Sequence, residues 1–178
     1  MPAINDMPTI SAQRRSLGLA LAIDCDGWSL ALDADPVERI VLLDETALAV
    51  APDDAGAFLG VVSLSGRAYA GFDLAQLLGR TPAPVAYVLL AVRYRNRRLP
   101  LALRTGHVRR VERAAELALR PLPAGLTPSR PGLFTHGFAT RGAGNSGIGF
   151  KLSLDKLLTP AELACGARAL ASPVIGVP

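Results

Sequence analysis

The chain has 178 residues, of which half are apolar and 19% are charged, and its formal net charge is +4. This composition excludes a disordered chain, and a chain of this length buries enough surface to fold without a disulfide or a metal ion. The longest uncharged runs, 55–66 and 81–92, span about 12 residues, whereas a membrane-spanning helix needs about 20.

The start of the chain resembles an export signal only in part. Arg14 and Arg15 precede an apolar segment, but no small-residue cleavage site follows it. We therefore interpret residues 1–16 as a polar tail and the apolar segment as the first strand. The two cysteines, Cys25 and Cys165, have no second Cys or His at metal-ligand spacing, which predicts free thiols in a reducing compartment. Together these features predict a cytoplasmic protein.

Strand signals dominate the first half of the chain. Runs of apolar residues bounded by Gly, Asp or Pro predict four strands: Leu17–Ile23, Trp28–Leu32, Phe58–Leu64 and Arg67–Phe72. Val37–Leu43 stays open between a helical turn, because its apolar residues recur at i, i+3 and i+4, and a strand. Ala51–Gly56 is predicted as a loop. Asp73 is a predicted N-cap for a short helix, Leu74–Leu78.

The second half continues the pattern of short strands. Four segments read as strands: Val85–Val92, Leu99–Thr105, Phe134–Thr140 and Ile148–Leu152. Val108 and Val111 mark a further extended piece, and Arg120–Pro131, with four prolines, is predicted as a loop. Helical signals come near the end, at Leu154–Leu158 and Ala161–Leu170.

Many short strands without long intervening helices predict an all-β barrel or sandwich. A weak internal repeat supports two related small barrels, because Phe58–Leu78 and Phe134–Leu158 each read as a hairpin that leads into a short apolar helix. We place the first barrel at about 17–84, the second at about 85–158, and a C-terminal helix at about 160–171.

The sequence holds few groups that do chemistry. His107 and His136 are its two histidines, and no serine lies in a nucleophile-elbow pattern. Gly142–Gly147 fits G-x-G-x-x-G, but a strand pattern follows it where a dinucleotide site needs a helix N-terminus. We therefore predict a protein that is not an enzyme, with no catalytic residues, no bound cofactor and no metal site.

One ordered set of residues resembles a known family. Gly60, Val61, Val62, Leu64, Gly66, Asp73 and Leu74 fit the pattern G-V-(V/I)-N-L-R-G-x-(V/I)-x-P-(V/I)-(V/I)-D-L. This resembles the signature of the CheW family of chemosensory coupling proteins. The flanks agree in order, with a V-x-x-I segment at Val37 and a V-x-x-V segment at Val108. The similarity covers most of Leu17–Leu158.

The resemblance implies a fold and a function. The family fold is two intertwined five-stranded SH3-like β-barrels with short helices. Family members are not enzymes; they are adaptors that couple a chemoreceptor cytoplasmic domain to a CheA-type histidine kinase. Residues that we expect either to line a groove for a receptor helix hairpin or to fill the core are Val37, Ile40, Gly60, Val62, Leu64, Ser65 and Arg67.

Four of the chain's departures from the family pattern are singled out. Ser65 stands where the family has an arginine important for receptor contact, and Gly106 stands where it has an aspartate. Ser63 and Ala70 replace an asparagine and a proline. Arg67 lies two residues after Ser65, and we hypothesise that it shares a strand face with position 65 and compensates for the missing charge.

A second hypothesis is a small-barrel nucleic-acid-binding protein. Arg93–Arg98 gathers basic residues with Tyr94 at a predicted hairpin tip, which is typical of a phosphate contact beside a stacking ring. The low aromatic content, 5%, argues against this alternative.

Overall fold

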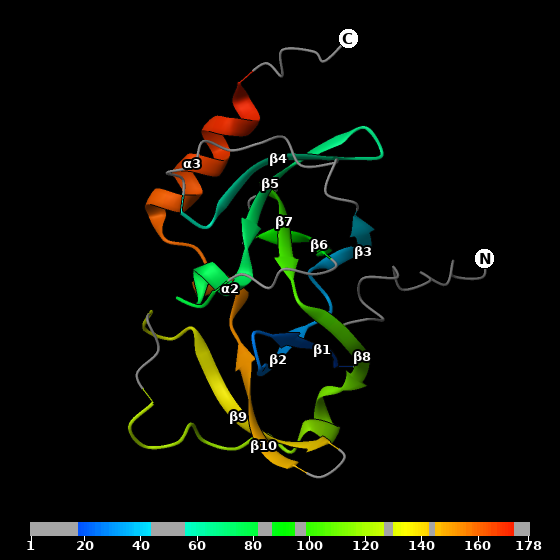
Figure 1. The fold of residues 1–178 in the computed structure, drawn as a ribbon, viewed down its shortest axis with the longest axis vertical. Helices are drawn as coiled ribbons and strands as arrows, with labels where there is room; N and C mark the ends of the chain where they lie inside the picture. The colour runs from blue at the N-terminus through cyan, green and yellow to red at the C-terminus, as the bar shows by residue number, and fades with distance from the viewer. Residues whose placement is uncertain are drawn as a thin grey trace, which may run out of the picture.

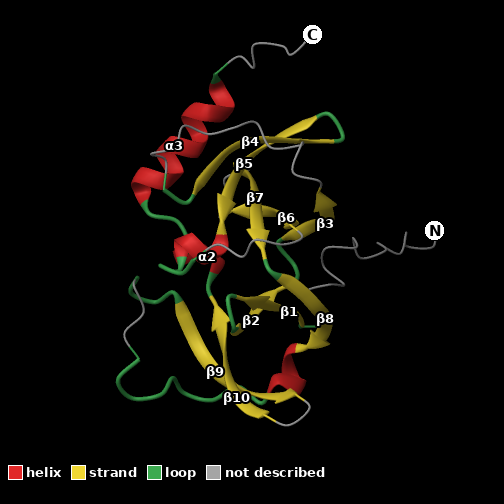
Figure 2. Ribbon diagram, viewed as in Figure 1, coloured by secondary structure: helices red, strands yellow, loops and turns green. Residues whose placement is uncertain are grey.

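The computed structural model of the chain describes residues 18–43, 56–81, 87–94, 99–126, 130–142 and 145–172. Within these ranges the protein is mostly β, with two five-stranded sheets stacked along the long axis and a helix beside one of them (Figures 1 and 2). The strands are β1 (Leu19–Cys25), β2 (Trp28–Asp33), β3 (Val37–Leu43), β4 (Phe58–Leu64), β5 (Arg67–Asp73), β6 (Tyr87–Tyr94), β7 (Leu99–Thr105), β8 (His107–Arg113), β9 (Phe134–Gly142) and β10 (Asn145–Leu152). The helical elements are α2 (Leu74–Leu77), the 3-10 turns η2 (Ala114–Leu117) and η3 (Leu154–Lys156), and α3 (Pro160–Ala171).

Most predicted strands are confirmed. The segment Val37–Leu43, for which the sequence allowed either a helical turn or a strand, is a strand. The helical signal at Leu154–Leu158 yields one 3-10 turn, η3, while the C-terminal signal is α3. Residues 1–16, nearly all of the predicted loop 51–56 and the tip 95–98 lie outside the described ranges. No helix in the part of the chain that the structure describes is long and apolar enough to cross a membrane.

The two sheets repeat one pairing scheme. The first has the order β8-β1-β2-β10-β9 and the second β3-β6-β7-β5-β4. In each, the third and fourth strands pair in parallel and all other neighbours pair antiparallel. Thus β8 corresponds to β3, β9 to β4, β10 to β5, and the hairpin β1–β2 to β6–β7. The internal repeat seen in the sequence is the pair β4–β5 and β9–β10.

The sheets are not consecutive in sequence. The first sheet takes β1 and β2 from the start of the chain and β8–β10 from its second half, while β3–β7 form the second sheet. The division expected near residues 84 and 85 therefore falls inside the second sheet. The cause is that the chain crosses between sheets twice, after β2 and after β7, so the two units are intertwined.

The second sheet is curled so that its two edge strands approach each other. Val41 of edge strand β3 packs against a buried cluster that includes Val62 and Leu64 of the opposite edge strand, β4, and Arg39 of β3 donates a hydrogen bond to Ser65 in the β4–β5 turn. No backbone ladder joins these edges within the described ranges, so the sheet is an open, curved one there.

One core connects the sheets. Alternate residues of β1 and β7, such as Leu21, Ile23, Leu101 and Leu103, share a single buried cluster with α2. Smaller residues on the opposite strand faces, such as Ala102, fill satellite clusters.

Helix α3 packs on the second sheet, against β4 and β5 (Figure 1). It begins with a capping box between Thr159 and Glu162. Gly166 permits the close approach, because a Cβ there would lie 3.0 Å from the Cβ of Ala70. Arg130 forms two hydrogen bonds with Glu162 and fixes the loop before β9 to the helix start.

Candidate functional site

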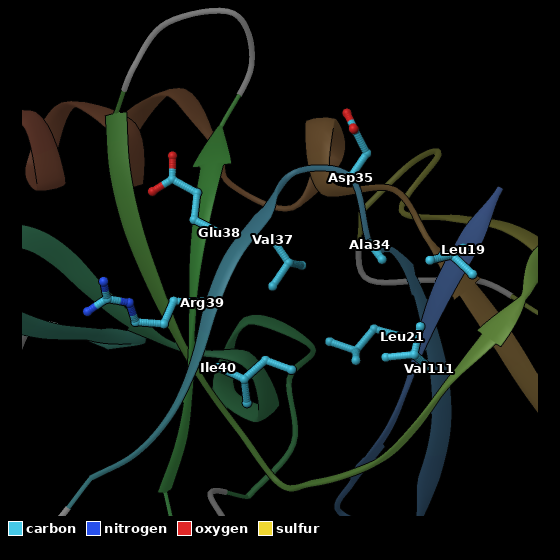
Figure 3. A pocket seen from close by; sticks show the side chains of 9 residues that line it. All are labelled: Leu19, Leu21, Ala34, Asp35, Val37, Glu38, Arg39, Ile40 and Val111. Atoms are coloured by element: carbon cyan, nitrogen blue, oxygen red, sulfur yellow. The ribbon is translucent and has the colours of Figure 1, made fainter. Parts of the chain in front are cut away.

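A groove of about 280 Å³ lies where the two sheets meet. Its walls come from β1, from edge strand β8 of the first sheet and from edge strand β3 of the second (Figure 3). The lining residues are Leu19, Leu21, Ala34, Asp35, Val37, Glu38, Arg39, Ile40 and Val111. The floor is therefore apolar, and the charged residues come from β3 and the turn before it.

Two large apolar side chains remain exposed in this groove. Ile40 is 45% exposed and Val111 is 54% exposed, and Figure 3 shows Ile40 and Val37 directed toward Leu21 and Val111. Among the described residues one other large apolar side chain, Ile148 on β10, is comparably exposed. The groove thus concentrates apolar surface that is open to solvent.

A β-bulge in each edge strand explains how these residues share a face. In β3 the register passes from Val37 directly to Arg39, so that Glu38 is an extra residue. In β8 the extra residue is Arg109, between the paired residues 108 and 110. One extra residue brings positions i and i+3 to the same side of a strand. The V-x-x-I and V-x-x-V segments therefore occupy equivalent places in the two sheets.

Polar contacts join β3 to the β4–β5 turn at one end of the groove. Arg39 Nη1 donates to Ser65 Oγ at 2.8 Å, and Arg67 Nη1 lies 3.4 Å from Glu38 Oε2. The Arg67 guanidinium also lies over the Tyr69 ring, 5.3 Å from its centroid. These contacts tie the curled edges of the second sheet together.

Ser65 occupies a strained position in a two-residue turn. Its φ is +49°, followed by +77° at Gly66, as the tight turn between paired residues 64 and 67 requires. Arg67, the hypothesised substitute for the family arginine, pairs with Glu38. The guanidinium that contacts Ser65 belongs to Arg39, from a strand 26 residues earlier.

The residues expected at a partner site divide into two groups. Val37 and Ile40 line the groove, and Ser65 and Arg67 contact its charged residues. The other three lie in the interior of β4: Val62 is 0% exposed, Leu64 is 6% exposed, and Gly60 is buried. Val62 and Leu64 belong to a buried satellite cluster, and Val37, which is 9% exposed, belongs to the main core cluster although it also lines the groove.

The structure adds residues that the sequence pattern did not single out. Leu19, Leu21 and Arg39 line the groove from β1 and β3. The available signal was the V-x-x-I spacing, which points to Val37 and Ile40 but not to the charged residues between them. The basic segment 93–98 of the nucleic-acid hypothesis lies outside the side chains that the structure describes.

A second, much smaller hollow of about 10 Å³ lies beside Cys25, Asp73, Arg104 and Gly106. Asp73 is 2% exposed, accepts from the backbone N–H of Gln76 at the start of α2, and forms an ion pair with Arg104. Burial, and to a lesser extent the nearby Asp73, raise the pKa of the Cys25 thiol to about 11. This hollow has room for no more than about one water, so it is a structural junction.

Gly106 shows why the family aspartate is absent here. A Cβ at this position would lie 2.0 Å from the backbone oxygen of Asp24. The chain crosses from β7 to β8 in direct contact with β1, and only glycine fits. Of the other departures, Ser63 is exposed and Ala70 is buried under α3.

Comparison with solved structures identifies the architecture. The crystal structure of the scaffolding protein TtCheW from Thermoanaerobacter tengcongensis is similar to 88% of this chain and 93% of that one, with a TM-score of 0.64 and 14% sequence identity. The chain has a CheW-like fold. No family model and no curated protein sequence matches it. The fold that the resemblance implied is therefore confirmed, at a low sequence identity.

Within this CheW-like fold the groove lies between the two interleaved sheets. Its exposed apolar residues come from the equivalent edge strands β3 and β8. Among the described residues no cluster of three or more His, Cys, Asp or Glu side chains is arranged for a metal ion.

Proposed function

We propose that the chain is a non-enzymatic cytoplasmic adaptor that couples a chemoreceptor to a CheA-type histidine kinase. The observation that carries the proposal is the apolar groove between equivalent edge strands of a CheW-like fold. An adaptor needs shape-matched apolar surface and no reacting group. The full two-barrel architecture and the identity of both partners belong to this proposal.

The groove fits the helical hairpin of a receptor cytoplasmic domain. Its exposed side chains, Ile40 and Val111, stand on facing strands and would pack against apolar residues at i, i+3 and i+4 of a helix. Burying each one more completely contributes about 1 kcal/mol. The two strands are related by the internal repeat, which suits two antiparallel helices that present similar surfaces to each wall.

The test uses three purified proteins: this chain, the cytoplasmic hairpin of a chemoreceptor from the same organism, and its CheA-type kinase. Binding of the chain to each is titrated by calorimetry. Ile40→Lys and Val111→Lys place a charge on the groove floor and should weaken hairpin binding by roughly tenfold or more. Both variants should keep their affinity for the kinase, which a separate surface must contact.

Ile148→Lys is the matched control, because Ile148 is 60% exposed on β10 and does not line the groove. It should bind the hairpin as the wild type does. Absence of wild-type binding to either protein would refute the adaptor proposal. Equal loss in all three variants would show that the groove is not the docking site.

A further inference from the structure

Arg39 is an exposed arginine at the groove whose charge is not matched by a carboxylate of the described residues. Among those residues it donates a hydrogen bond to the neutral hydroxyl of Ser65, at 2.8 Å. Within the described part of the chain no Asp or Glu oxygen lies within ion-pair distance of its guanidinium. Arg39 is one of the residues that line the groove, and Figure 3 shows its guanidinium at the flank, extending away from Leu21 and Val111.

Its neighbours differ in this respect. On the opposite groove strand, Arg109 pairs with Asp24 and Arg110 pairs with Glu112. At the same end of the groove as Arg39, Arg67 pairs with Glu38. These three arginines therefore already have carboxylate partners, and a partner's carboxylate would have to displace them.

The contact with Ser65 holds Arg39 ready for such a group. A guanidinium has five N–H donors, and the hydroxyl occupies one of them. A carboxylate accepts two parallel, charge-assisted hydrogen bonds from an arginine, which are about twice as strong as neutral ones. Because the side chain is already positioned by Ser65, less conformational entropy is lost when it binds.

We propose that Arg39 recognises an Asp or Glu side chain that flanks the apolar stripe of the docked helix. This inference rests on the adaptor function proposed above and names a specificity determinant within its groove. The partner helix accordingly carries its acidic residue on the side that faces the β4–β5 turn. Ser65 is a positioning residue that orients the guanidinium.

The experiment titrates the purified chemoreceptor hairpin into wild-type chain and four variants at low and high salt. Arg39→Glu should weaken binding roughly 10- to 100-fold, and Arg39→Lys should lose less because it keeps the charge but not the paired donors. Ser65→Ala should cost a factor of about two to three, since it removes only the positioning contact. Arg168→Glu, an equal charge reversal at an exposed position on α3, should bind as the wild type does.

A charge exchange identifies the partner residue. Each acidic residue of the hairpin is changed to Lys, and one such variant should recover binding to Arg39→Glu while binding the wild-type chain poorly. Folding of each variant is checked by its melting temperature, and Arg39→Gln serves if the reversal unfolds the chain.

The two proposals fail differently. If wild-type chain binds the hairpin and Arg39→Glu binds as tightly as Arg168→Glu, the role of Arg39 is refuted and the adaptor function stands. If Arg39→Glu is weaker but no hairpin Lys variant rescues it, the recognition of an acidic side chain is refuted. If wild-type chain does not bind the hairpin at all, the adaptor function fails, and the inference with it.

Discussion

The buried carboxylate of Asp73 offers the sharpest test of what holds the second sheet together. It caps α2 through Gln76 and pairs with Arg104, whose side chain is 14% exposed. Asp73→Asn separates the two roles. Asparagine caps a helix about as well as aspartate, so the substitution removes the charge and keeps the cap.

The expected cost follows from the burial of both groups. Removing one partner of a buried ion pair costs about 3 to 5 kcal/mol, and the lower end applies because Arg104 keeps some contact with water. Asp73→Ala also removes the cap, for about 1 kcal/mol more. With a urea m-value of about 2 kcal/mol/M, Asp73→Asn should lower the unfolding midpoint by about 1.5 M.

The assay is equilibrium urea unfolding followed by circular dichroism. Asp33→Asn is the control, because Asp33 also forms an ion pair, with Lys151 at 2.9 Å, but is 58% exposed. Its loss should cost less than about 1 kcal/mol. If Asp73→Asn shifts the midpoint no more than Asp33→Asn does, the pair between Asp73 and Arg104 does not stabilise the fold as argued.

Three further predictions concern other buried contacts. Gly106→Ala should destabilise the fold by roughly 2 to 3 kcal/mol in urea unfolding, because its Cβ would meet the backbone oxygen of Asp24; a neutral result would refute the close approach. Since burial raises the pKa of Cys25 to about 11, a thiol reagent at pH 8 should label Cys165 in the native protein and both thiols only in denaturant. Burial alone would raise the pKa of Glu162, but hydrogen bonds from its arginine and threonine partners outweigh it and lower the pKa. The stabilisation from Glu162 is then present above the ordinary glutamate pKa and is lost as pH falls through the lower folded value, so the deficit of Glu162→Gln should be largest near pH 7 and shrink in acid; a deficit independent of pH would contradict this.

The local elements could be predicted because each depends on neighbouring residues. Phe58–Leu64 and Leu99–Thr105 have the predicted bounds, since apolar runs between tight turns leave little choice of structure. The order of strands in the sheets depends on distant partners. Nothing local in Leu17–Leu32 shows that this hairpin joins strands from the second half of the chain. The predicted barrel boundary near residue 84 therefore divided the chain into consecutive halves, whereas the sheets combine distant segments.

The burial of individual side chains on β4 could not be predicted from the local sequence either. Alternation would put one face of β4 outward, and the apolar residues Val62 and Leu64 were candidates for either side. They are buried in a cluster with Tyr69 and Ala102, against which Val41 of the far edge strand packs, and this packing depends on the sheet's curvature. Ile40, one residue before Val41, is left 45% exposed in the groove.

The spacing of Val37 and Ile40 shows how one pattern can have two physical causes. Residues at i and i+3 share a face in a helix, and in a regular strand they lie on opposite faces. The segment is nevertheless a strand, because a bulge at Glu38 restores the common face. The same device recurs at Arg109 in β8, so the spacing marks a bulged edge strand in both halves of the fold. Only Glu38 is left out of the ladder; Arg39 pairs with Ala91, and its side chain reaches Ser65 in the β4–β5 turn.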